Sequence, residues 1–82
     1  MNKEVVHYLL SEAVEEYKCA CPDKDATKLH AALGLVASGP DPLDRAVLGE
    51  VRTVVEQMLI FGEPRGLPTV RRLEAELKQA GF

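Results

Sequence analysis

Two histidines and two cysteines are the residues of this sequence whose types could bind a metal ion. His7 and Cys19 lie twelve positions apart in one expected helix, which separates them by about 18 Å along its axis. Cys19 and Cys21 differ by two positions, so they point to nearly opposite sides of that helix. A zinc site that also used His30 would require the helix to end before Cys19. We therefore expect no metal and no other cofactor.

The same residue types do not form a recognisable catalytic pattern. Both histidines fall at the flanks of apolar stripes, where a half-buried, hydrogen-bonded histidine is common. The sequence contains no arguable Ser–His–Asp pattern and no glycine-rich phosphate loop after a strand. Glu12, Glu15 and Glu16 are interpreted as one solvated helix face. We therefore expect a non-enzymatic protein without catalytic residues, and we infer no small-molecule substrate.

Phosphate binding is a further chemistry that the residues near the C-terminus could perform. The stretch TVRRLEAELKQAGF, residues 69–82, combines a Thr start, an Arg pair, leucines four apart and an Ala-Gly-hydrophobic ending. It resembles the recognition helix of winged-helix proteins, and GLPTVRRLEAEL is similar to the start of plasmid KfrA-type DNA-binding domains. The resemblance implies a small DNA-binding regulator. In that regulator the side chains meeting nucleic acid would be Arg65, Arg71, Arg72 and Lys78.

Several features depart from that family pattern. The chain ends at Phe82, where a wing should begin, and the preceding helix is expected to have about twenty residues, whereas a helix-turn-helix has a short helix there. The net charge of −3 has the wrong sign for a generic nucleic-acid binder. Arg72 could instead pair with Glu76, four positions later. The last helix would then be a structural element of the domain.

Length and composition indicate a small globular domain. The 82 residues suffice for one domain, of which 46% are apolar and 28% charged. A chain of this length has a thin core and modest stability. Two cysteines one residue apart provide no disulfide framework, which favours a reducing, cytoplasmic setting. We expect no signal peptide and no membrane span, because no apolar run approaches about 18 residues.

Proline and glycine divide the chain into four stretches with helical periodicity. The breaks are Pro22, the pair Gly39-Pro40, and residues 62–68. No alternation of period two is long enough for a strand. The sequence therefore predicts a single all-α domain of four helices, at about 3–21, 24–38, 42–61 and 69–80.

Capping residues and apolar arcs give these helices their predicted ends and partners. Asp23 is the predicted N-cap of the second helix and Asp41 that of the third. The third helix has the widest apolar arc, so we expect it to be central and to contact at least two others. Gly81 should adopt the left-handed conformation after the fourth helix, with Phe82 folding back onto Leu77.

Four apolar side chains lie on helix faces that are otherwise polar. They are Tyr8, Cys19, Leu35 and Ile60. A thin-cored domain with a wide apolar helix often completes its burial against a partner chain. We therefore predict a small interaction or regulatory protein that acts through helix-face contacts with a protein partner or as a homodimer or other oligomer. DNA binding through residues 69–80 is the alternative, and we expect no membrane partner.

Overall fold

The computed structural model describes residues 2–60 and 67–82 of the chain, and these residues form an all-α fold. The helices are α1 (Lys3–Ala20), α2 (Thr27–Ser38), α3 (Arg45–Ile60) and α4 (Pro68–Gln79), and no strand occurs in the described residues. The predicted small all-α domain with four helices is therefore confirmed.

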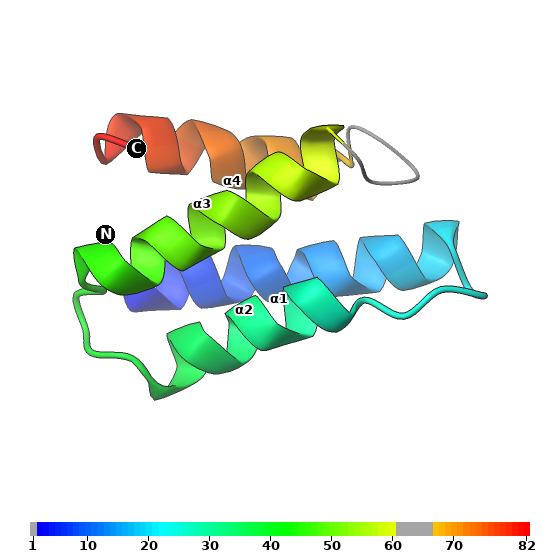
Figure 1. Ribbon diagram of the computed structural model, residues 1–82, viewed down its shortest axis with the longest axis horizontal. Coiled ribbons are helices and arrows are strands. Elements are labelled where there is room, and N and C mark those ends of the chain that lie inside the picture. Colours follow the sequence, from blue (N-terminus) through cyan, green and yellow to red (C-terminus); the bar gives the residue numbers. More distant parts are fainter. Residues whose placement is uncertain (1, 61–66) are drawn as a thin grey trace.

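The helices form an antiparallel ring in which each helix runs opposite to the one before it (Figure 1). α1 packs against α2 and α4, and α3 packs against the same two helices. Within the described residues, no Cα atoms of the diagonal pairs α1/α3 and α2/α4 approach within 8 Å. The N-terminal half of α1 therefore lies beside the C-terminal half of α4, which becomes important for the candidate site.

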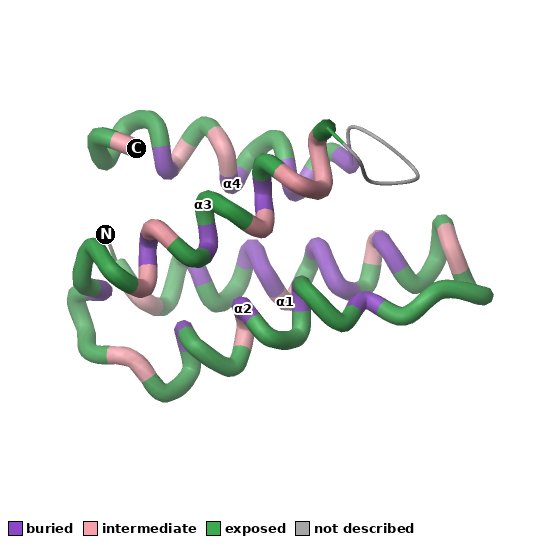
Figure 2. The backbone as a smooth tube through the Cα atoms, in the orientation of Figure 1, coloured by how far each residue is buried: buried purple, intermediate pink, exposed green. Residues whose placement is uncertain are grey.

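The core lies between the four helices and is built mainly by α1 (Figure 2). The buried residues of α1 are Val6, Leu9, Leu10, Ala13, Val14 and Tyr17. α3 buries Leu48, Val51 and Val55. As predicted, α3 packs against two other helices, α2 and α4. The prediction that α3 is the central helix was wrong, because these two neighbours leave Val54 and Met58 only partly buried.

α2 begins three residues later than predicted, at Thr27 instead of residue 24. The backbone N–H of Lys24 donates to the carbonyl oxygen of Cys21 at 3.1 Å, which closes a turn before the helix. Ala26 occupies the N-cap position, and no side chain caps α2. The predicted capping role of Asp23 was therefore wrong.

α3 also begins later than predicted, at Arg45 instead of residue 42. Asp44 acts as the cap, because its Oδ1 accepts a hydrogen bond from the backbone N–H of Val47 at 2.9 Å. The predicted cap, Asp41, instead accepts a hydrogen bond from the backbone N–H of Lys3 at 3.4 Å. Two aspartates three positions apart competed for this role, and the one nearer the helix performs it.

The remaining helix ends differ from the prediction by single residues. α1 ends at Ala20, since Cys21 is its C-cap, and α4 spans Pro68–Gln79 instead of residues 69–80. The predicted end of the third helix, Phe61, lies outside the described residues.

The predicted ending of α4 is confirmed in detail. Gly81 has a φ of 92°. Glycine adopts this left-handed conformation readily because it has no Cβ atom. Its N–H donates to the carbonyl oxygen of Lys78 at 3.1 Å, and the N–H of Phe82 donates to that of Leu77 at 2.8 Å. These two bonds define a Schellman motif. The Phe82 ring lies 4.8 Å from the guanidinium carbon of Arg45, so the chain end also contacts α3.

Candidate functional site

The four predicted interaction residues are all exposed, but they belong to different parts of the surface. The exposed fractions are 58% for Tyr8, 56% for Ile60 and 43% for Leu35, and Cys19 is also exposed. Tyr8 and Cys19 are on α1, Leu35 is on α2 and Ile60 is the last residue of α3. The sequence therefore identified exposed apolar side chains without identifying which of them have apolar neighbours.

Val5 is the apolar neighbour that the sequence analysis missed. It is 42% exposed and precedes Tyr8 by three positions in α1. Residues three apart lie side by side on a helix surface, so the spacing alone could have revealed the pair. Val5 and Tyr8 are the two large apolar side chains of α1 that are exposed.

Val5 and Tyr8 line a shallow concavity of about 600 Å³ between α1 and α4. We define the Tyr8 surface as six of its residues: Glu4, Val5, His7, Tyr8, Arg72 and Glu76. The antiparallel packing of α1 on α4 brings the last two residues beside the first four. The sequence predicted an ion pair between Arg72 and Glu76, but the described residues contain no salt bridge between these two side chains. The Tyr8 surface thus combines an apolar centre with charged groups of both signs.

A second concavity continues along the same α1–α4 seam. It has a volume of about 530 Å³ and is lined by Glu12, Glu15, Glu16, Cys19, Leu67 and Pro68, among others. The carboxylates of Glu12 and Glu15 are exposed, whereas Glu16 is half-buried and bonded to α4. The outer side of α1 therefore changes from apolar near Tyr8 to acidic toward Cys19.

The predicted nucleic-acid contacts are only partly assembled. Arg71, Arg72 and Lys78 are exposed on α4, while Arg65 lies outside the described residues. The Nζ of Lys78 lies 4.0 Å from Oε1 of Glu74, so this cation already has a nearby carboxylate. α3 runs antiparallel to α4 (Figure 1) and has 16 described residues. In a helix-turn-helix the two helices cross at a wide angle.

The zinc-ligand residue types are dispersed. His7 and Cys19 are exposed on α1, His30 is exposed on α2, and Cys21 is half-buried at the C-cap of α1. Within residues 2–60 and 67–82, no group of three or more His, Cys, Asp or Glu side chains is placed to hold a metal ion.

Comparisons with known proteins add no functional assignment. No protein-family model, curated protein or solved structure matches this chain. None of the helices in the described part of the chain has the length and apolarity needed to cross a bilayer. Any functional conclusion must therefore come from the surfaces described above.

Proposed function

We propose that this chain is a non-enzymatic interaction protein whose docking surface is the Tyr8 surface. The observation that carries the proposal is the exposure of Val5 and Tyr8 side by side in a concavity between α1 and α4. Single exposed apolar residues are normal, but an apolar pair in a hollow with an adjacent arginine is less so. Tyrosine and arginine are the residue types that protein interfaces favour and that supply much of their binding energy.

The charges along α1 support a partner with a basic segment. Glu12 is exposed, and Glu15 has only a long contact of 4.0 Å with the exposed Lys18. Such a surface ion pair is worth little, so exchanging Lys18 for a partner's cation costs little. A helix with one or two apolar side chains over Val5 and Tyr8, followed by lysines or arginines over the glutamates, would match this face.

A second copy of the chain is a poorer match for the same face. In an antiparallel pairing of two α1 helices about Glu12, the glutamates of one copy would approach those of the other. Like charges at the centre of an interface oppose association. A different protein is therefore a better match for this face than the homodimer that the sequence also allowed.

Site-specific photo-crosslinking in the cell of origin tests the docking surface. The crosslinking residue p-benzoylphenylalanine is placed at position 8 and, as matched controls on other exposed apolar sites, at positions 35 and 60. We expect a specific product from position 8, with a partner segment that has the apolar and basic pattern. Products confined to position 35 or 60 would contradict the proposal, and a product containing only a second copy would convert it into a homodimer.

Calorimetry with the crosslinked segment as a synthetic peptide then measures the contribution of each side chain. Tyr8→Ala should weaken binding at least tenfold, as expected for an interface hot spot. Leu35 is also exposed but lies on α2, outside the Tyr8 surface, so Leu35→Ala should leave the affinity unchanged. Equal affinities for the two variants would show that the Tyr8 surface does not bind the peptide.

Nucleic-acid binding through α4 has weaker support. The exposed Arg71 and Lys78 favour it, while the net charge of −3 and the Lys78–Glu74 contact oppose it.

The proposed setting is cytoplasmic, because Cys19 and Cys21 take part in no disulfide bond. Cell fractionation would test that location directly.

A further inference from the structure

The exposed side of α1 has the spacing of a coiled-coil seam. Its residues follow one another at intervals of three and four positions, and each of them is exposed: Val5, Tyr8, Glu12, Glu15 and Cys19. At about 100° per residue they fall within an arc of roughly 80° on one side of the helix. Alternating intervals of three and four are the heptad spacing by which one helix packs lengthwise on another. We call these residues the outer stripe of α1.

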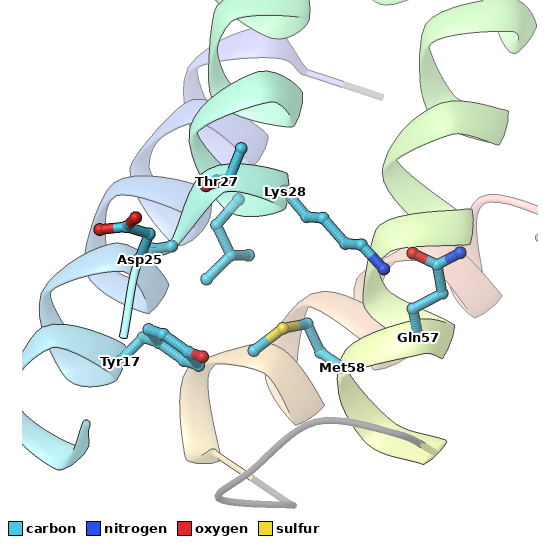
Figure 3. A pocket seen from close by; sticks show the side chains of 8 residues that line it. Tyr17, Asp25, Thr27, Lys28, Gln57 and Met58 are labelled. Atoms are coloured by element: carbon cyan, nitrogen blue, oxygen red, sulfur yellow. The ribbon is translucent and has the colours of Figure 1, made fainter. Parts of the chain in front are cut away.

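The opposite side of α1 is already covered by the rest of the domain. Tyr17 on that side is only 9% exposed, and Figure 3 shows its ring next to Met58 of α3, beside a cavity of about 230 Å³. Among the residues that the structure describes, no buried side-chain nitrogen or oxygen atom lacks a hydrogen-bond partner. That cavity therefore gives no indication of a ligand, and the outer stripe is the side of α1 that is open to a further helix.

The outer stripe follows the two hollows along the α1–α4 seam. Its first two residues, Val5 and Tyr8, line the hollow of about 600 Å³, and its last three line the hollow of about 530 Å³. α4 contributes Arg72 to the first hollow and Pro68 to the second. From Val5 to Cys19 the stripe extends about 21 Å, or about four helical turns. A helix laid along it would therefore lie in a shallow groove between α1 and α4, as in helix-in-groove recognition.

The centre of the outer stripe carries two carboxylates without a close cation. Glu12 forms no ion pair within the described part of the chain, and Glu15 has only the contact of 4.0 Å with Lys18. An apolar helix laid over these carboxylates would bury them without a counter-ion, which costs free energy. Lysine or arginine at the facing positions would instead form charge-assisted hydrogen bonds with them.

Both ends of the outer stripe are apolar. Val5 and Tyr8 form one end. Cys19 forms the other, where it lines the same hollow as the exposed Pro68, and a free thiol behaves as a small apolar group. From Val5 to Cys19 the stripe therefore reads apolar, apolar, acidic, acidic and apolar. A complementary helix has cations at its centre and apolar side chains at both ends.

A second copy of α1 does not have this complementary pattern. In a parallel pairing, Glu12 and Glu15 of one copy would face the same two residues of the other. The outer stripe contains no lysine or arginine that could pair with them in either direction. Like charges at the centre of an interface oppose association. The complementary helix therefore has a different sequence from α1.

We infer, on the basis of the proposed docking function, that the partner presents a helix of about four turns that packs lengthwise on the outer stripe in heptad register. Its facing positions are apolar over Val5 and Tyr8, lysine or arginine over Glu12 and Glu15, and apolar again over Cys19. The proposed docking function places the partner at Tyr8. The outer stripe adds the length, the register and the sequence pattern of the partner helix.

A photo-crosslinking scan along α1 of the full chain, in the cell of origin, tests this register. p-Benzoylphenylalanine is placed in turn at positions 8, 12, 15 and 19 of the outer stripe. The controls are positions 7 and 18, which are exposed on α1 but point about 100° or more away from the centre of the stripe. We expect one partner from all stripe positions, with little product from the controls. The crosslinked partner residues should move along one helix in steps of about four, three and four.

The scan separates the register from the docking function. Product from position 8 without product from 12, 15 and 19 would overturn the heptad register while the docking function stands. Product from positions 7 and 18 as abundant as from the stripe would do the same. No product from position 8 would contradict the docking function as well. Product that joins only two copies of the chain would overturn the inferred partner helix.

Charge exchange tests the central cations, with the crosslinked segment as a synthetic peptide and calorimetry as the measurement. Glu12→Lys and Glu15→Lys should each weaken binding about tenfold, because attraction becomes repulsion. Glu50→Lys makes the same charge change at an exposed site of α3 and should alter the affinity less than about twofold. A peptide with glutamate in place of the facing cation should restore binding to the Glu12→Lys chain.

The comparison of these variants has clear contrary outcomes. Equal losses for Glu12→Lys and Glu50→Lys would show a nonspecific charge effect and overturn the inferred pairing. Failure of the exchanged peptide to restore binding would show that the cation does not face Glu12. All the substituted residues are exposed, so circular dichroism should show the parent fold in each variant. If the Glu12 variant does not fold, the Glu15 variant and its exchanged peptide decide.

Discussion

The backbone N–H of Thr69 donates a hydrogen bond to Oε1 of Glu16 at 3.2 Å, which joins two residues 53 positions apart. Thr69 is buried and lies in the first turn of α4, where backbone N–H groups have no acceptor within the helix. Glu16 of α1 therefore caps α4 from a neighbouring helix. The same helix α1 provides both the docking surface that we propose and an anchor for the element that forms its other wall.

Glu16→Ala should lower the free energy of unfolding by about 1 kcal/mol, the usual cost of losing an N-terminal cap. Glu16→Gln keeps an acceptor oxygen and should lose less. Glu12→Ala changes an exposed glutamate on the same helix and should be nearly neutral. Urea denaturation measures all three variants. Equal losses for the Glu12 and Glu16 variants would contradict a capping role.

Val51→Asp should unfold the domain or come close to doing so. Val51 is fully buried in α3, and the new carboxylate would have no partner there. The expected cost is several kcal/mol, comparable to the whole stability of a small domain. Ala46→Asp, on the exposed side of the same helix, is the control and should retain the fold. Circular dichroism during heating distinguishes the two, and an unchanged melting temperature for Val51→Asp would be the contrary result.

Two glycines should respond in opposite directions to alanine. Gly81→Ala forces a side chain onto a residue with φ of 92°, which costs roughly 1–2 kcal/mol. Gly34 lies within α2, and an added Cβ would meet no atom within 4 Å, so Gly34→Ala should raise stability by roughly 0.5–1 kcal/mol. Thermal melts of both variants test the pair. A stabilising Gly81→Ala would mean that the Schellman ending is not kept in solution.

Removing Gly81 and Phe82 together tests the whole chain ending. The deletion eliminates two backbone hydrogen bonds to α4 and the contact of Phe82 with Arg45. We expect a loss of roughly 1–2 kcal/mol from capping and packing. A truncated chain as stable as the full one would show that the last two residues contribute nothing.

The features that the sequence predicted well are those set by neighbouring residues. Pro22 and Gly39 separate the first three helices, and Gly81 with Phe82 completes the ending of α4, because these residues act on their own backbone. Helix starts were less predictable, since several acidic residues compete for each cap. Asp44 rather than Asp41 caps α3, and neither Asp23 nor any other side chain caps α2.

Contacts between helices could not be predicted from the sequence alone. By periodicity alone, Ala20, Ala37 and Ala80 would lie on the buried sides of their helices. All three are exposed, and each lies within one residue of the end of its helix. The exposure of Tyr8 was predictable, whereas its position beside Arg72 depends on how α1 meets α4. The space beside Tyr17 likewise depends on the separation of α2 and α3, which no local pattern specifies.

A chelator should leave the fold unchanged. We predict that EDTA does not reduce the helical circular dichroism signal, because His7, Cys19, Cys21 and His30 are not gathered at one point. Metal-dependent small domains unfold when their metal is removed. Loss of helicity with EDTA that zinc restores would revive these residues as ligands, for example between two copies of the chain.

The exposed cations of α4 should not give specific DNA binding. Each phosphate contact releases counterions, so binding through Arg71 and Lys78 would fall steeply with salt concentration. The net charge of −3 opposes the approach of a polyanion, and Glu74 lies beside Lys78. We therefore expect gel-shift assays at physiological salt to show no affinity above the nonspecific level, which is about 10⁻⁴ to 10⁻⁶ M for DNA-binding proteins.

The double variant Arg71→Ala, Lys78→Ala makes this last test decisive. Both side chains are exposed, so the variant should melt like the parent chain and any loss of binding would report on DNA contact alone. Lys24→Ala, in the connection between α1 and α2, removes one exposed positive charge outside α4 and serves as the control. If the parent chain bound one DNA sequence selectively at micromolar or tighter concentration, and only the double variant abolished that binding, α4 would be a reading helix. Val70, Leu73 and Leu77, which are buried, would then hold it against the bundle while its outer face contacts DNA.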